Sequence, residues 1–305
     1  MATFDASKLN FPFMKYRKML IGISLVCILA SFGLLMTKGL NLGVDFTGGL
    51  VLQVKFEKPV DIAEVRSALS KIDQGNATIQ AFDATDVLLR FQAQDDQVRK
   101  DVLDVLKTDV GNYKVLRIDK IGPVVGSELR AQATYALLLA LAGILIYMAF
   151  RFRFRFGAAA VISLMHDVIL MLGVYSLTGK EVSVTFIAAI LTVAGYSLND
   201  SIVVLDRIRE NLKLHPKGDR QQLFNASINE TLARTINTSL STLIVLLCIF
   251  ILGGDSIRSF AFAMILGVVI GTLSSLFVAS PIAYLLMNKK GVKASVPAEE
   301  AKQAE

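Results

Sequence analysis

Six long apolar runs alternate with polar stretches along this chain of 305 residues. Each run has about the 20 residues that an α-helix needs to cross roughly 30 Å of hydrocarbon. We therefore predict transmembrane helices at residues 19–37, 132–150, 157–177, 182–205, 236–252 and 260–287. A cytoplasmic N-terminal segment at 1–18 and a disordered cytoplasmic tail at 288–305 are expected to flank them.

Between the first two helices, residues 38–131 follow a different pattern. Alternating or apolar stretches predict four strands, and amphipathic stretches predict a helix that starts near Asp61 and a second one before Gly111. The predicted strands are 50–56, 77–82, 86–92 and 113–121, and the second helix is 95–110. The order β-α-β-β-α-β is typical of a ferredoxin-like sheet covered by two helices. The expected fold is an α-helical membrane bundle of six transmembrane helices with one extracytoplasmic α+β ferredoxin-like (βαββαβ) domain.

Composition agrees with a membrane protein, because 53% of the residues are hydrophobic and the mean hydropathy is +0.55. Lys and Arg gather before the first predicted helix, at 151–155, at 207–220 and at 289–293, whereas the opposite short loops carry one basic residue each. The positive-inside rule then places both termini in the cytoplasm. The alternating Arg and Phe residues at 151–156 fit a cytoplasmic hairpin better than a nucleic-acid site, so no nucleic acid is expected.

Catalytic and metal-binding patterns are weak in this sequence. Cys27 and Cys248 both fall inside predicted helices, which gives no disulfide framework, and His166 and His215 are too few for a histidine metal site. We find no nucleotide-binding loop and no nucleophile triad. The sequence therefore argues against a membrane enzyme and predicts no cofactor.

Asp200 lies in the apolar stretch 184–205, where a carboxylate costs roughly 2.5–3.5 kcal/mol to insert. Arg234 stands at the entrance of the next predicted helix, which returns from the same side of the membrane. We therefore expect Asp200 and Arg234 to meet at similar depth, with Asp200 in the cytoplasmic third of its helix. Spacing alone leaves two alternatives open, a static buried ion pair and a site for charge or proton movement.

Other membrane positions support weaker hypotheses. His166 and Asp167 lie near the middle of the third predicted helix, where a packing hydrogen bond and a relay role are equally compatible with the pattern. Gly195 could admit another backbone or a local bend. Gly267 and Gly271 predict a close helix contact, with a partner protein as the candidate neighbour.

Five motifs in order resemble the SecF family of the bacterial SecD–SecF translocase accessory complex, over nearly the whole chain. They are LGVDFTGG at 42–49, GPVVG at 122–126, His166-Asp167, the segment AGYSLNDSIVVLDRIREN at 194–211 and ARTINTSLST at 233–242. The resemblance implies a member of the resistance-nodulation-division superfamily that uses the proton gradient in protein export. It also implies that Asp200 and Arg234 take part in proton conduction, with Asp167, His166 and Asn199 as further candidates.

A structural role is expected for a further set of positions, most of them where the outer domain joins the membrane helices. Paired glycines there suit a turn that needs positive φ. The set comprises Asp45, Gly48, Gly49, Gly122, Pro123 and Gly126, together with Gly195 within the fourth helix.

Implied partners are SecD, which would supply a second six-helix half, the SecYEG channel and the polypeptide that SecA drives through it. Contacts with YajC and YidC stay open. The expected location is the bacterial inner membrane, and protons are the expected coupling ion. The alternative is a self-contained proton-driven exporter of drugs or lipids from the same superfamily, against which the single small outer domain and the six helices count.

Overall fold

The computed structural model describes residues 11–75, 77–91, 96–152, 154–253 and 255–288. Within them, six helical stretches are long and apolar enough to cross a membrane. They are α1 (Arg17–Thr37), α5 (Pro123–Arg151), α6 (Phe154–Thr178), α7 (Val184–Leu214), α8 (Arg220–Leu252) and the run that starts with α9 (Asp255–Ser274). Residues 1–10 and 289–305, which include most of the two expected cytoplasmic segments, lie outside the described residues.

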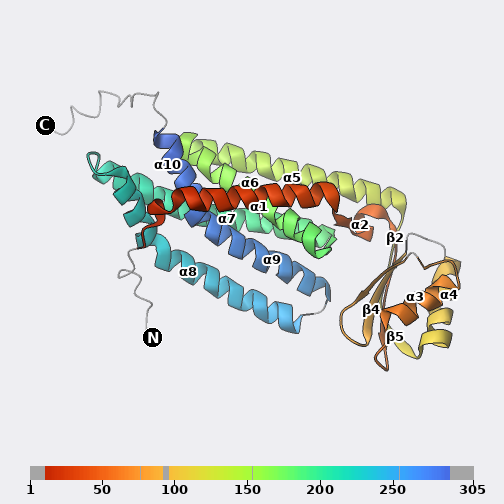
Figure 1. Cartoon of the computed structure of the whole chain (residues 1–305). Helices are drawn as coiled ribbons and strands as arrows, with labels where there is room; N and C mark the ends of the chain where they lie inside the picture. Colours follow the sequence, from red (N-terminus) through yellow and green to blue (C-terminus); the bar gives the residue numbers. More distant parts are fainter. Residues whose placement is uncertain (1–10, 76, 92–95, 153, 254, 289–305) are drawn as a thin grey trace.

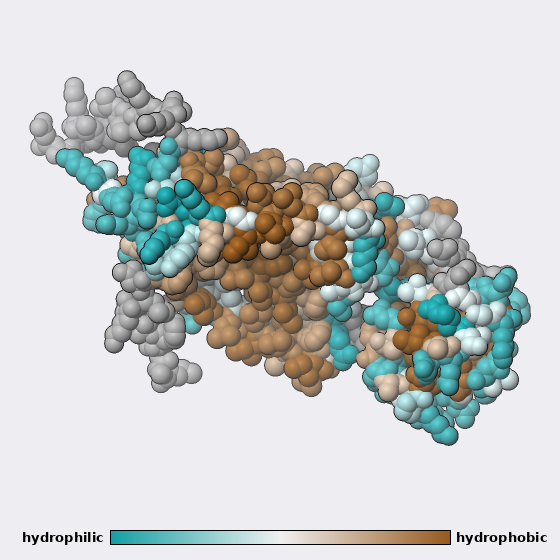
Figure 2. Space-filling model, viewed as in Figure 1, coloured by the Kyte–Doolittle hydropathy of each residue, from teal (hydrophilic) through white to brown (hydrophobic). Residues whose placement is uncertain are grey.

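The helices form a long bundle with the outer domain at one end (Figure 1). The start of α1 and the C-terminal part of α10 (Ser280–Asn288) both lie at the opposite end of the bundle. Figure 2 shows a broad apolar band over the bundle between hydrophilic ends. This is the surface of a protein that spans a lipid bilayer.

Two helices are much longer than the apolar runs from which they were predicted. α7 continues from the predicted end at 205 to Leu214, and α8 starts at Arg220 rather than at 236. The added turns are polar, so a search for apolar residues cannot find them. Asp219 stabilises the start of α8, because its carboxylate accepts hydrogen bonds from the backbone N–H groups of Gln221 and Gln222.

The last predicted helix, 260–287, is interrupted in the structure. α9 ends at Ser274 and passes through the π-helical turn η4 (Ser275–Ala279) into α10. Pro281 lacks a backbone N–H and its ring would clash in a regular α-helix. The wider π turn directly before it accommodates this proline, and the Ser280 hydroxyl donates to the Ser275 carbonyl at 3.1 Å.

The outer domain is a four-stranded antiparallel sheet with helices on one face. Its sheet order is β3-β4-β2-β5. Leu52 of the central strand β2 stands between Leu89 of β4 and Ile118 of β5, and Leu52 and Leu89 are fully buried beside Val65 and Val102 from the helices. The elements are β2 (Gly49–Phe56), α3 (Ile62–Ser70), β3 (Thr78–Ala81), β4 (Asp86–Phe91), α4 (Asp96–Val105), the π turn η3 (Leu106–Val110) and β5 (Tyr113–Ile121).

A short connector that the sequence pattern did not reveal joins this domain to the bundle. β1 (Asn41–Leu42) pairs in parallel with β6 (Glu181–Val182), which lies between α6 and α7. One turn of helix, α2 (Val44–Thr47), follows. Two-residue strands carry no periodicity, so only the fold can show them.

The glycine motif after α2 allows a close backbone approach. Gly48 and Gly49 have φ values of +71° and +136°, a conformation that the paired glycines predict. A Cβ on Gly126 in the first turn of α5 would lie 2.9 Å from the Gly48 nitrogen. Gly122 is the N-cap of α5 and Pro123 is its first residue, a position that proline favours.

Helices α6, α7 and α9 form the interior of the bundle, and α1, α5 and α8 are more exposed. The prediction that Gly267 and Gly271 face a partner protein is wrong, because both lie against α7 of the same chain. A Cβ on Gly267 would come within 2.2 Å of a Val193 methyl group, and one on Gly271 within 3.0 Å of the Ser197 Cβ. The small residues let α9 approach α7 closely.

We predict that Gly267→Ala destabilises the fold by roughly 1–3 kcal/mol, because the new methyl group overlaps Val193 in a packed helix contact. Unfolding of the detergent-solubilised protein would measure this loss. Gly143→Ala is the matched control, since nothing lies within 4 Å of a Cβ at that position of α5. Equal stability of the Gly267 variant and the wild type would contradict the close contact.

Candidate functional site

Asp200 lies near the middle of α7 and is half-buried where α7 meets α8 and α9. The polar turns of α7 after residue 205 put Asp200 near the middle of the whole helix, and its place in the cytoplasmic third of the membrane span stays a prediction. Its carboxylate interacts with the hydroxyl groups of Ser239 from α8 and Thr272 from α9. A cavity of about 10 Å³ beside it is close to the smallest space that holds one water molecule. The lining is Tyr196, Ser197, Asp200, Thr238, Ser239, Thr242, Val268, Gly271 and Thr272.

The two hydroxyl groups beside Asp200 are also bonded to each other. Ser239 Oγ and Thr272 Oγ1 lie 2.6 Å apart, and Thr272 donates to the Val268 carbonyl at 2.7 Å. Asp200 is therefore in contact with a short chain of hydroxyls that joins α8 to α9.

Asp167 forms a second polar centre, fully buried among three helices. Ser197 of α7 donates to its Oδ2 at 2.5 Å, and Ser274 of α9 donates to the same atom at 2.7 Å. Nδ1 of His166 lies 2.9 Å from Oδ1. Asp167, with His166 beside it, thus holds α6, α7 and α9 together. A relay role for the two residues stays a prediction.

Ser197 connects the two carboxylate regions. Its hydroxyl bonds Asp167, while the residue also lines the small cavity at Asp200. Hydroxyl groups both donate and accept, so they can pass a proton between acidic groups as well as orient them. The arrangement brings Asp167 and Asp200 into one polar seam between α6, α7, α8 and α9.

Three buried hydroxyls continue this seam toward the end of the bundle where α10 terminates. Within the described residues, the side chains of Ser163, Ser201 and Thr235 have no hydrogen-bond partner. Each stands one helical turn from a seam residue: Ser163 from Asp167, Ser201 from Ser197 and Thr235 from Ser239. Buried hydroxyls without a partner are uncommon and require an explanation such as a water molecule or a functional path.

Arg234 does not form the expected ion pair with Asp200 among the residues that the structure describes. Arg234 is exposed on α8, and its charge reaches Asp200 only through space. A direct ion pair is therefore not formed among the described residues, while the electrostatic interaction is consistent with two groups at similar depth.

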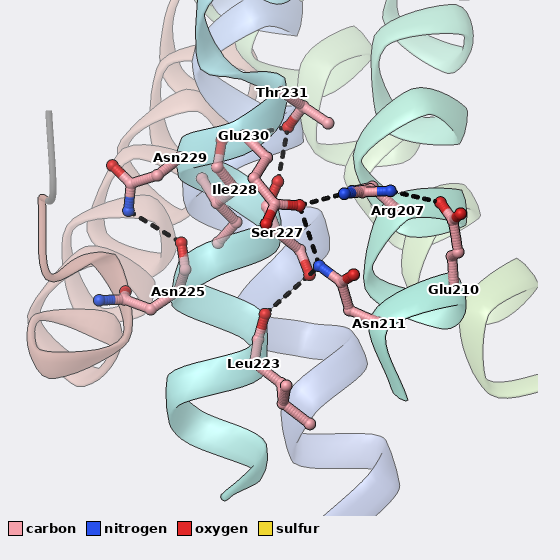
Figure 3. Close-up of polar contacts among 10 residues, drawn as sticks. All are labelled: Arg207, Glu210, Asn211, Leu223, Asn225, Ser227, Ile228, Asn229, Glu230 and Thr231. Carbon is pink, nitrogen blue, oxygen red and sulfur yellow. Dashed lines mark hydrogen bonds and ion pairs between the residues drawn. The ribbon is translucent and has the colours of Figure 1, made fainter. Parts of the chain in front are cut away.

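An ion-pair network does join α7 to α8, through residues that follow Asp200 on α7 and precede Arg234 on α8 (Figure 3). Arg207 binds Glu230 at 2.5 Å and Glu210 at 2.7 Å. Asn211 donates to Ser227 at 2.9 Å and to Glu230 at 3.0 Å. This network holds the C-terminal part of α7 against the N-terminal part of α8, on the side of the seam where α10 terminates.

A polar face of α7 and α8 is left exposed in this chain. Tyr196 is 42% exposed, and the other members of the face are exposed as well. Among the described residues, nothing lies within 4 Å of a Cβ built on Gly195, so the space beside this glycine is open. The face comprises Thr192, Gly195, Tyr196 and Asn199 on α7 with Arg234, Asn237 and Ser241 on α8.

Sequence reasoning missed Ser239, Thr272 and Ser274. Ser239 gives no local signal, because the side of α8 that meets Asp200 is set by how that helix packs against α7 and α9. Thr272 and Ser274 could be assigned to the site only if the side of α9 that faces α7 were known. The packing of Gly267 and Gly271 against α7 sets that side.

Comparison with known proteins gives a consistent result. The family described as "Protein export membrane protein SecD/SecF, C-terminal" matches residues 101–289, and "SecD/SecF GG Motif" matches residues 33–60. The protein translocase subunit SecF of Desulfurispirillum indicum is 44% identical over 281 residues, which cover 88% of this chain and 89% of that protein. SecF of Pseudomonas aeruginosa is 41% identical over 271 residues, with coverage of 88% and 89%.

Solved structures agree with these relatives. The crystal structure of SecDF, a translocon-associated membrane protein from Thermus thermophilus, superposes with a TM-score of 0.86 at 38% identity. The match covers 92% of this chain and 39% of that one. A structure of SecDF in the Super-membrane-facing form gives a TM-score of 0.69 at the same identity, over 96% of this chain and 40% of that one.

We predict that Asp167→Ala lowers the stability of the bundle by about 1–3 kcal/mol, because two buried hydroxyls lose their common acceptor. Asp167→Asn, which retains one acceptor oxygen, should lose less. Unfolding of both variants in detergent compares them. A fully stable Ala variant would show that the polar centre contributes nothing to packing.

Proposed function

The chain belongs to the SecF family of protein translocase subunits. It is therefore a multi-pass protein of the bacterial inner membrane with an accessory role in Sec protein export. We propose how it supplies energy to that export. It couples the proton-motive force to late steps of polypeptide translocation and release. Protons are the coupling ion, and Asp200 is the group that binds them. The observation that carries this proposal is a half-buried carboxylate in contact with a chain of hydroxyls between three helices.

Asp200 has the surroundings that proton transfer requires. The hydroxyls of Ser239 and Thr272 give its proton a bonded neighbour, and Ser197 offers a route toward Asp167 and His166. The unpartnered hydroxyls of Ser163, Ser201 and Thr235 extend the polar seam by one turn. Asp167 and His166 are accordingly secondary members of the proposed relay, and Asn199 is a further candidate on the exposed face beside Arg234.

Arg234 is proposed as the movable cation of this mechanism. It carries no ion pair within the described residues, and it shares an exposed polar face with Asn199. Protonation of Asp200 removes the negative charge that attracts Arg234, so the two protonation states favour different positions of α8 relative to α7. The conformational energy comes from that change of charge.

The exposed polar face of α7 and α8 is the proposed docking side for a second half of the membrane unit. An arginine exposed to lipid on a membrane-spanning helix is costly, so another protein surface must cover it. This chain matches only 39% of the solved SecDF chain, which leaves ample length for such a half. We propose that SecD supplies it, in line with the SecD-associated complexes to which SecF relatives belong.

The outer domain is proposed to be the part that acts on the exported chain. Its β-α-β-β-α-β order and its sheet order β3-β4-β2-β5 support a ferredoxin-like fold. In this scheme the termini are cytoplasmic, and SecYEG with a SecA-driven polypeptide lies next to the complex. Roles for YajC and YidC have no support from the geometry.

The energy available is adequate for a conformational switch. One elementary charge that crosses the membrane potential releases about 2.3 kcal/mol per 100 mV, enough to shift a two-state equilibrium about fifty-fold. The alternative of a self-contained drug or lipid exporter lacks comparable support, because the curated relatives are named as translocase subunits and the bundle leaves a polar face uncovered. Those names describe transport rather than catalysis.

We predict that Asp200→Asn assembles with SecD but loses gradient-stimulated export at least ten-fold, because the amide keeps the shape and cannot titrate. Export into inverted membrane vesicles with and without a proton gradient would measure this loss. Asp206→Asn on the same helix is the matched control, since Asp206 pairs with Arg151 outside the seam. Full stimulation by the Asp200 variant would remove Asp200 from the mechanism.

A further inference from the structure

The loop between α6 and α7, residues 179–183, is held by the segment that leads from α1 into the outer domain. Lys38 donates to the Leu177 carbonyl at 2.8 Å, and Asn41 donates to the Gly179 carbonyl at 3.0 Å. β1 pairs with β6, and the N–H of Gly43 binds the Val182 carbonyl at 2.8 Å. The outer end of α7 is therefore attached to the connector as well as to α6.

Asp45 strengthens this attachment at the first turn of α7. Its Oδ2 accepts a hydrogen bond from the N–H of Val184 at 2.9 Å. A carboxylate at a helix N-terminus satisfies a free N–H group and interacts favourably with the helix dipole. Since α7 also carries Asp200, the glycine-motif segment is in direct contact with the helix of the proposed proton site.

One ion pair links the outer domain itself to the same loop. Arg90 of β4 binds Glu181 of β6, with the two side chains 10% and 24% exposed. Burial lowers the pKa of Arg90 to about 10, and the nearby Asp45 charge opposes this decrease, so Arg90 stays charged at neutral pH. A buried charge of this kind needs its partner in place.

Two chain connections also join the described domain to the bundle: α2, and the direct passage from β5 into α5 at Gly122. α2 joins both parts, because Val44 packs in an outer-domain cluster and Phe46 packs against the bundle. A single turn of helix can act as a pivot but resists rotation poorly. Beside it, a cavity of about 340 Å³ separates the sheet from the bundle, with charged lining residues Asp45, Arg90, Arg117, Asp119, Lys180, Glu181 and Arg258.

We propose that Arg90 and Glu181 are positioning residues that fix the outer domain to the N-terminal end of α7, so that movement of α7 turns the domain. The chain connections lie at α2 and at Gly122, and the ion pair on β4 adds a separate attachment point that restricts rotation of the domain about them. This inference rests on the proposed function, since it routes the effect of Asp200 protonation through α7. Neither residue was identified from the sequence, because their meeting depends on the position of the folded domain.

The test compares export by the complex with SecD in inverted membrane vesicles. Glu181→Gln and Arg90→Gln should each lower gradient-stimulated export about five-fold while SecA-driven export without a gradient stays unchanged. The exchanged pair, Arg90→Glu with Glu181→Arg, should recover at least half of the stimulation. Asp96→Asn is the matched control, because it breaks the exposed Lys120–Asp96 pair inside the same domain.

A covalent link separates positioning from general damage. In a chain with Cys27→Ser and Cys248→Ser, the double variant Arg90→Cys with Glu181→Cys should be defective and should regain stimulation when a bifunctional thiol reagent joins the two sites. Wild-type stimulation in the single variants, or no recovery after complete linkage, would overturn the proposal. Asp200→Asn in the same vesicles distinguishes the two claims. If Asp200→Asn loses stimulation while the Glu181 variants stay active, only the link through α7 is rejected. If Asp200→Asn keeps its stimulation, the proton site itself is rejected.

Discussion

The need to satisfy a buried carboxylate inside an apolar bundle determines much of this structure. No solvent is available to Asp167 at the centre of α6, α7 and α9, so its oxygens must find donors on neighbouring helices. Ser197 and Ser274 supply them at 2.5 and 2.7 Å. Those two bonds fix the rotation of α7 and α9 about their axes, which in turn decides which residues of each helix meet Asp200.

Close helix packing follows from the same geometry. Serine hydroxyls reach Asp167 only if α9 approaches α7 closely, and Gly267 and Gly271 permit that approach. The second carboxylate, Asp200, then lies at the edge of the three-helix group α6, α7 and α9, beside Ser239 and Thr272. Its half-buried position and the exposed Arg234 give the bundle a rigid inner seam and an incomplete outer face, which is the arrangement expected of one half of a larger membrane unit.

The sequence predicted the six apolar helices well because hydropathy reports directly on contact with lipid. It failed at the polar turns of α7 and α8 and at the π turn before Pro281, where helices continue or deform without an apolar signal. It singled out Asp200 as a candidate, since a carboxylate in an apolar run is conspicuous. Ser239, Thr272 and the Arg90–Glu181 pair depend on helix rotation and on the placement of a separate domain, neither of which has a local signature.

Proton uptake by sealed liposomes that contain the chain with SecD tests the central claim most directly. A pH-sensitive dye inside the liposomes would report uptake when a membrane potential is imposed. The account predicts uptake above that of protein-free liposomes for the wild type, and none above that background for Asp200→Asn. Equal uptake by the wild type and this variant would contradict the assignment of Asp200 as the proton-binding group.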